Sequence, residues 1–82
     1  MVEHDEKTKS FYLVEDGYKA FICYEINNGE LDVLTTQVPK AISGRGLASR
    51  LMKTCATFVH ENGLKFKKDQ SCSYAKSWLE RN

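Results

Sequence analysis

The first half of the chain alternates between hydrophobic and polar positions with the period of two that is typical of β-strands. Residues 10–14 (SFYLV) are aromatic and branched, and residues 31–38 (LDVLTTQV) form a similar run that ends at Pro39, which has no N–H for a ladder. The clearest alternation lies in residues 18–26, whose apolar face consists of Tyr18, Ala20, Ile22, Tyr24 and Ile26. These three runs predict three strands.

The links between these strands are short and contain glycine. Residues 15–17 (EDG) and residues 27–30 (NNGE) are turn sequences, and the Asn-Gly pair favours a type I′ hairpin because both residues accept positive φ. Short links join antiparallel neighbours, so we expect a three-stranded antiparallel meander.

After Gly46 the hydrophobic period becomes that of an α-helix, with apolar residues at Leu47, Leu51, Cys55 and Phe58. Gly63 follows in the place of a helix-terminating residue. This stretch predicts a central amphipathic helix.

The last third predicts a short strand and a second helix. Residues 64–66 (LKF) are long enough only for a short strand, and residues 73–81 (SYAKSWLER) carry a helical apolar edge that Ser71 or Ser73 is suited to cap. A strand–helix–strand order favours parallel pairing of the third and fourth strands. The expected fold class is therefore α+β: a meander, a central helix, a fourth strand parallel to the third, and a C-terminal helix.

Length and charge narrow the picture. The 82 residues suffice for one domain, which we assign to residues 9–82 after a flexible N-terminal tail, residues 1–8. Twelve Lys and Arg oppose eleven Asp and Glu, and a net charge of +1 gives little support to a nucleic-acid partner. No apolar run approaches the roughly 20 residues of a membrane helix, so no membrane partner is expected.

The three cysteines, Cys23, Cys55 and Cys72, are widely spaced and form no CxxC pair. This pattern matches neither a disulfide framework nor a zinc site, so we expect no metal. Free thiols are typical of a reducing compartment, which predicts an intracellular, cytoplasmic location.

Two glycines, Gly44 and Gly46, flank Arg45 immediately before the central helix. The first N–H groups of a helix have no intrahelical partner, and a glycine-rich loop lets ligand oxygens approach them. Neither the GxxxxGK[ST] nor the complete GxGxxG spacing is present. From the residues alone, an anion seat and a purely structural turn are both open.

The stretch VPKAISGRGLASRLM after a meander resembles the acetyl-CoA signature of the GNAT superfamily of N-acetyltransferases. In that superfamily an [RQ]-x-x-G-x-[GA] loop binds the pyrophosphate through backbone amides, and Ser43 to Ala48 align with it. Ser43 stands where Arg or Gln is usual. The resemblance implies acetyl-CoA as co-substrate and a binding site formed by Val38, Ser43, Gly44, Arg45, Gly46, Leu47, Ala48, Ser49 and Tyr74.

The resemblance extends over nearly the whole chain to a minimal single-domain GNAT-like family that includes a human N-acetyltransferase domain-containing protein. The shared features are A-x-x-x-Y-E (residues 20–25), V-P before the loop, ENGLK (residues 61–65) and C-S-Y (residues 72–74). Many relatives carry a histidine in the third strand where this chain has Thr35. A base role for that histidine therefore does not transfer.

Cys72 lies at the start of the second helix, where the helix N-terminus, with Lys67 and Lys68 nearby in sequence, favours a nucleophilic thiolate. The resemblance also points to Cys72 as the catalytic residue. The alternative is a partly buried core residue, as we expect for Cys55 and Cys23.

Tyr74 has two open interpretations: protonation of the leaving CoA thiolate, as tyrosines do in the superfamily, or packing against Trp78. Glu25, Asp32 and Tyr74 are the candidates for a general base, by their chemistry alone.

The sequence therefore predicts an enzyme, an acetyl-CoA-dependent N-acyltransferase that moves an acetyl group to an amine acceptor, with Cys72 as the thiol on the route. Two alternatives belong to other classes. One is a CoA-binding module without transfer activity, and the other is a protein- or RNA-interaction domain that uses exposed lysines such as Lys65, Lys67 and Lys68.

Overall fold

The three predicted strands form the centre of one sheet. In a computed structural model, which describes residues 1–82, they are β2 (Ser10–Glu15), β3 (Tyr18–Asn27) and β4 (Glu30–Gln37), paired antiparallel. The turn between β3 and β4 has φ of +53° at Asn28 and +78° at Gly29, as a type I′ turn requires. The predicted meander is confirmed.

The meander has one more strand than the hydrophobic pattern predicts. β1 (Glu3–Asp5) pairs antiparallel with β2, in the region assigned to a flexible tail. Its anchor is His4, whose ring stacks on Phe11 at 4.1 Å between ring centroids and whose Nε2 lies 2.6 Å from the Tyr24 hydroxyl. Because the neighbouring residues are charged, no hydrophobic alternation marks this strand in the sequence.

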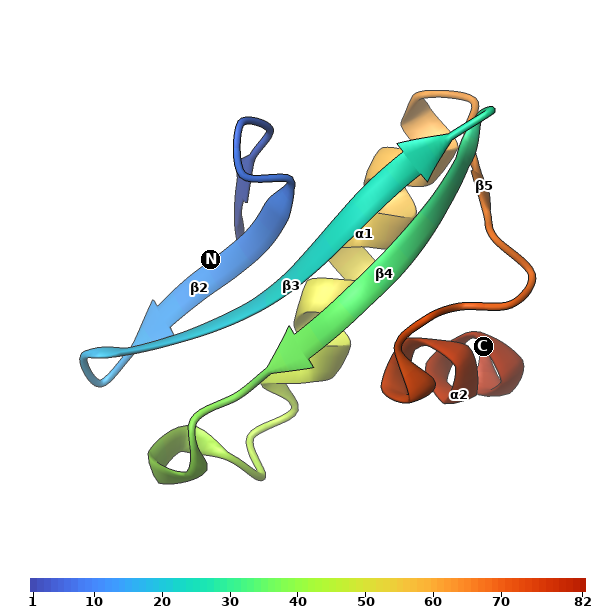
Figure 1. The fold of residues 1–82 in the computed structure, drawn as a ribbon. Coiled ribbons are helices and arrows are strands. Elements are labelled where there is room, and N and C mark those ends of the chain that lie inside the picture. Colours follow the sequence, from blue (N-terminus) through green and yellow to red (C-terminus); the bar gives the residue numbers. More distant parts are fainter.

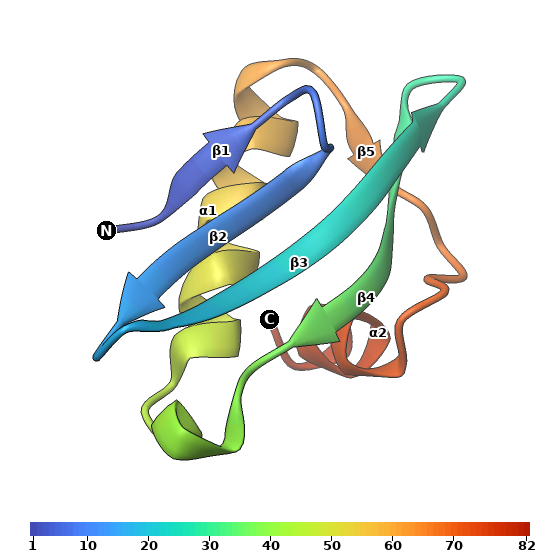
Figure 2. The ribbon, with the colours of Figure 1, turned by 60° about the vertical axis from the view of Figure 1, so that its left-hand side comes forward.

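The central helix, α1, spans Leu47–Glu61 and follows a short 3-10 helix, η1 (Lys40–Ile42). It lies across one face of the sheet (Figures 1 and 2). The helix ends as predicted, since Gly63 has a left-handed φ of +65°. Its buried stripe consists of Leu47, Leu51, Met52, Cys55 and Val59.

The last third contains β5 (Lys65–Phe66) and α2 (Ser73–Arg81). β5 pairs parallel with the start of β4, so the sheet order is β1-β2-β3-β4-β5 and the α+β fold is confirmed. The predicted serine cap of α2 is wrong. Cys72 is the N-cap residue, and no side chain caps the helix.

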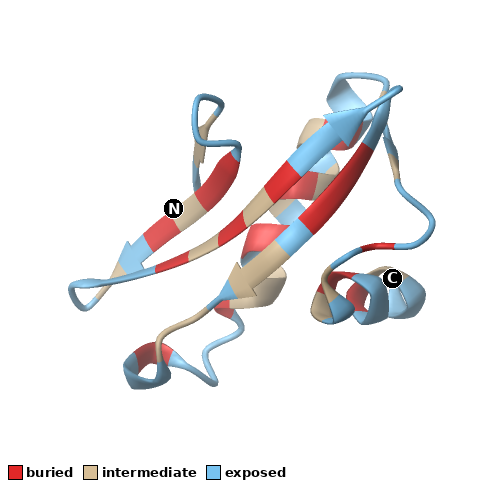
Figure 3. Cartoon of the chain, in the orientation of Figure 1, coloured by how far each residue is buried: buried red, intermediate tan, exposed pale blue.

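One hydrophobic core lies between the sheet and the helices (Figure 3). In the middle of β3 the buried residues Ala20, Ile22 and Tyr24 alternate with the half-buried Phe21 and Cys23, because successive side chains of a strand point to opposite faces. Ala75 and Trp78 join α2 to the same core. Neither helix is long and apolar enough to cross a membrane.

Candidate functional site

The glycine loop forms a bare backbone surface at the N-terminus of α1. Gly44 and Gly46 both have left-handed φ, +78° and +73°, and a Cβ built on either would meet no atom within 4 Å. The backbone conformation therefore favours glycine at both positions, and the space beside the loop is open. Gly46 is the N-cap of α1, and no acidic side chain lies in the first turn. Such a terminus attracts anions.

The side chains of this loop are occupied within the protein. The Ser43 hydroxyl donates to the Lys40 carbonyl oxygen at 2.9 Å, which holds it against the preceding turn. The Ser49 hydroxyl accepts the indole N–H of Trp78 at 3.0 Å. An anion at this loop would consequently rely on backbone N–H groups.

Arg45 points to the turn between β2 and β3. Its Nη1 lies 2.7 Å from an Asp16 carboxylate oxygen and 2.8 Å from a Glu15 carboxylate oxygen. The hydrogen bonds that Arg45 donates, first to Asp16 and then to Glu15, raise the pKa of its guanidinium above the ordinary value. Arg50, one helical turn further, lies 3.9 Å from Glu15. The resemblance places Arg45 in the acetyl-CoA site, and in the structure its guanidinium is paired with two carboxylates.

Strand β4 is irregular where it approaches α2. In the β3–β4 register Cys23 lies opposite Thr35 and Tyr24 lies opposite Val33, so Leu34 has no partner and forms a β-bulge. Beyond Val33, no backbone hydrogen bond joins the outer edge of β4 to the segment after β5. At this edge the backbone N–H and C=O groups of β4 are free to pair with an extended ligand or peptide.

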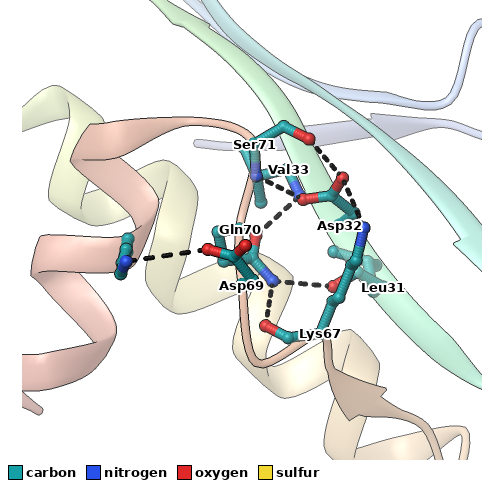
Figure 4. A network of polar contacts seen from close by, with 8 residues as sticks. Leu31, Asp32, Val33, Lys67, Asp69, Gln70 and Ser71 are labelled. Carbon is teal, nitrogen blue, oxygen red and sulfur yellow. Dashed lines mark hydrogen bonds and ion pairs between the residues drawn. The ribbon is translucent and has the colours of Figure 1, made fainter.

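Gln70 closes the ladder just before that edge (Figure 4). Its Oε1 accepts the Val33 N–H at 2.7 Å, and its Nε2 donates to the carbonyl oxygens of Leu31 at 2.9 Å and Lys67 at 2.8 Å. The side chain is buried, and it takes the place of a backbone peptide after β5 ends. The Gln70 side chain and the N–H of Cys72, which donates to the Val33 carbonyl oxygen, together set the point where β4 becomes unpaired.

Asp32 fixes the residue before Cys72 (Figure 4). Its buried carboxylate accepts the Ser71 N–H at 2.7 Å and the Ser71 hydroxyl at 2.6 Å, and Lys67 Nζ lies 3.9 Å away. Of the three candidate bases, Asp32 thus has both carboxylate oxygens engaged by Ser71. Glu25, its cross-strand partner, is exposed.

Cys72 is held against β4 at two atoms. Its N–H donates to the Val33 carbonyl oxygen at 2.9 Å, and its Sγ lies 3.3 Å from the Thr36 hydroxyl oxygen. The side chain is partly buried. Lys67, expected beside the thiol, is paired with Asp32 instead. Thr36 was missed by sequence reasoning, since nothing local marks it as a partner of a residue 36 positions away.

The remaining residues of the predicted acetyl-CoA site differ in how far they are buried. Leu47 is buried, and the other four are partly buried: Val38, Ala48, Ser49 and Tyr74. Of these four, Val38 and Tyr74 pack against the hydrophobic core. The contact between Ser49 and Trp78 joins the helix of the loop to the helix of Cys72.

The remaining cysteines have structural surroundings. Cys55 is fully buried, and burial raises the pKa of its thiol to about 12. Cys23 is partly buried within the sheet, opposite Thr35. No three His, Cys, Asp or Glu side chains come together as metal ligands.

Comparisons with known proteins identify the family of this chain. A family model described as GCN5-related N-acetyl-transferase matches residues 10–82. Protein NATD1 of Xenopus tropicalis is 34% identical over 84 residues, which cover 99% of this chain and 75% of the frog protein. Protein NATD1 of Danio rerio is 34% identical, and that of Homo sapiens is 33% identical, each over 99% of this chain and over 74% and 73% of their own lengths. The chain therefore belongs to the GCN5-related N-acetyltransferase family.

Proposed function

We propose that this protein binds acetyl-CoA and transfers its acetyl group to an amine. The observation that carries the proposal is the glycine loop: two left-handed glycines leave open space at the N-terminus of a 15-residue helix. Backbone N–H groups there suit a pyrophosphate, and the family uses acetyl-CoA. Val38 and Ala48 would line the approach to these N–H groups, whereas Leu47, whose side chain is buried in the core, would contribute only its backbone.

The thioester arm would lie along the unpaired edge of β4, beyond Val33. Extended amide groups add to a free strand edge through main-chain hydrogen bonds. This position brings the thioester toward the bulge at Leu34 and toward Cys72, which the Val33 carbonyl and Thr36 hold.

Transfer would then proceed through Cys72. The thiolate attacks the thioester carbonyl carbon, a backbone N–H of β4 stabilises the oxyanion, and the bond to the CoA sulfur breaks. Tyr74 would supply the proton to the leaving CoA thiolate. The amine then attacks the cysteine thioester, gives its proton to the Tyr74 phenolate as the amide forms, and releases Cys72 as the thiolate, so both groups return to their starting states.

CoA binding is tested by thermal shift and isothermal titration of the wild type and two matched variants. Gly46→Ala and Gly63→Ala place a Cβ at left-handed φ at opposite ends of α1, with no atom within 4 Å in either case. Both should lose stability by about 1–2 kcal/mol. Only Gly46→Ala should also lose CoA binding, because its Cβ points into the space the pyrophosphate needs. Equal CoA binding by both variants, or none by the wild type, contradicts the proposal.

The covalent step is tested by mass spectrometry after incubation with acetyl-CoA. An acetyl adduct should form on the wild type and not on Cys72→Ser. Adduct-free protein that still releases CoA with an amine present would indicate direct attack by the amine.

A CoA-binding module without transfer is the second candidate, and Asp32 favours it. This buried carboxylate is held by two hydrogen bonds from Ser71 and lies 3.9 Å from Lys67, so it is engaged in structure and poorly placed to act as a base. Saturable CoA binding with no CoA release for any amine would support the module.

A further inference from the structure

We propose that Glu15 and Asp16, here called the carboxylate pair, compete with the pyrophosphate of CoA for Arg45 and so set the affinity of the site. The inference rests on the proposed acetyl-CoA site and adds the β2–β3 turn to it. It makes these two residues determinants of ligand affinity, although they lie some thirty positions away from the glycine loop in sequence.

One nitrogen of Arg45 connects the glycine loop to the β2–β3 turn. Arg45 Nη1 donates to Glu15 at 2.8 Å and to Asp16 at 2.7 Å, across 30 and 29 positions of sequence. Arg45 lies between the two left-handed glycines, so the guanidinium is attached to the same backbone that would receive the anion. The ion pair therefore holds the Arg45 guanidinium toward the β2–β3 turn.

The charges around the loop balance without a ligand. The carboxylate pair is opposed by Arg45 and by Arg50, 3.9 Å from Glu15. A pyrophosphate entering beside Gly44 and Gly46 brings further negative charge next to two carboxylates. It gains full use of the Arg45 guanidinium only when that side chain releases them.

The exposure of these groups makes the exchange feasible. The side chains of Arg45 and Asp16 are 43% and 64% exposed, and that of Glu15 is 31% exposed. Ion pairs of this kind are worth little individually, so a strongly charged ligand can displace them. Their effect should be a moderate reduction in affinity.

The experiment is isothermal titration of CoA into the wild type and three variants: E15Q/D16N, R45Q, and the triple combination. E15Q/D16N should bind CoA about three- to tenfold more tightly than the wild type, the range expected for two exposed ion pairs. R45Q should bind more weakly. In the R45Q background, E15Q/D16N should change CoA affinity little, because the guanidinium for which the carboxylates and the pyrophosphate compete is absent.

Two controls separate this effect from overall charge and from the thioester arm. E61Q/E80Q neutralises two exposed carboxylates on other parts of the surface and should leave CoA affinity unchanged. S-acetyl-pantetheine lacks the pyrophosphate, so E15Q/D16N should not alter its affinity.

Several results would overturn the inference while CoA binding stands: equal affinity of wild type and E15Q/D16N, weaker binding by E15Q/D16N, or the same gain in the R45Q background. If no variant binds CoA, the proposed function fails together with this inference. The two failures are thus distinguished by whether the wild type binds CoA.

Discussion

The sulfur of Cys72 lies 3.3 Å from the hydroxyl oxygen of Thr36, so the N-cap of α2 is joined to the unpaired part of β4 by one side-chain pair. Either group can donate in this contact, which holds the thiol in one position against β4. This pair gives the first prediction.

Thr36→Val should slow modification of Cys72 by iodoacetamide about two- to tenfold, the equivalent of one hydrogen bond. Thr36→Ser keeps the hydroxyl and should react at nearly the wild-type rate. The rates are measured by mass spectrometry in a Cys23→Ser background, which leaves Cys72 as the partly exposed thiol. Equal rates for Thr36→Val and Thr36→Ser would show that the contact has no influence on reactivity.

Asp32→Asn should reduce the free energy of unfolding by about 1–3 kcal/mol, because a buried charged acceptor of two hydrogen bonds is replaced. Ser71→Ala is the matched control. It removes only the hydroxyl bond and keeps the Ser71 backbone N–H on Asp32, so its loss should be smaller. Urea denaturation measures both, and a larger loss for Ser71→Ala would contradict this account.

Because the Cys55 thiol is buried, we expect the free energy of unfolding to fall at alkaline pH. Burial raises the pKa of its thiol from 9.0 to about 12 in the folded state, so the folded protein resists the ionisation that the unfolded chain undergoes. The resulting stabilisation is complete below pH 9 and is lost as the pH rises from about 9 toward 12, at up to about 1.4 kcal/mol per pH unit.

Urea denaturation between pH 8 and about 11 measures this decline, with Cys55→Ala as comparison. The Cys55→Ala variant is less stable at neutral pH but should lose less stability on going to high pH. Burial also raises the pKa of Tyr24, so both proteins retain some decline from that group. Parallel curves for the two proteins would exclude a contribution from Cys55.

Trp78→Phe should lower the free energy of unfolding by about 1 kcal/mol beyond its change in buried area, because Ser49 loses its indole donor. In the Ser49→Ala background the same substitution should be less damaging. Thermal melts of the four proteins give the coupling between α1 and α2, and additive effects would show that this bond is not energetically significant.

The elements that local pattern predicts are those whose own residues determine them. The Asn28–Gly29 turn, the stripe of α1 and its end at Gly63 follow from backbone preference and periodicity, and the structure has all three. β1 escaped prediction because its one informative residue, His4, is recognisable only beside Phe11 and Tyr24, which come from later strands.

The sequence predicted the backbone features of the candidate site better than the contacts of its side chains. The glycine loop and Cys72 stand out in the sequence, and the structure puts the glycines in the left-handed conformation that the loop needs. The partners of Arg45, Asp32 and Cys72 lie 29 to 39 positions away and depend on how strands and helices come together. No short-range rule of sequence specifies such pairs.

The hydrogen bonds of Gln70 to β4 are contacts between residues far apart in sequence, which affects when they form and how easily they open. Its bonds to Val33 and Leu31 connect residues 37 and 39 positions apart, so a long loop must close before they can form. The Val33 amide, held by a single side chain, should therefore exchange with deuterium ahead of the β2–β3 amides. Its exchange rate then reports how often the edge beside Cys72 opens, and a ligand bound along that edge would slow it.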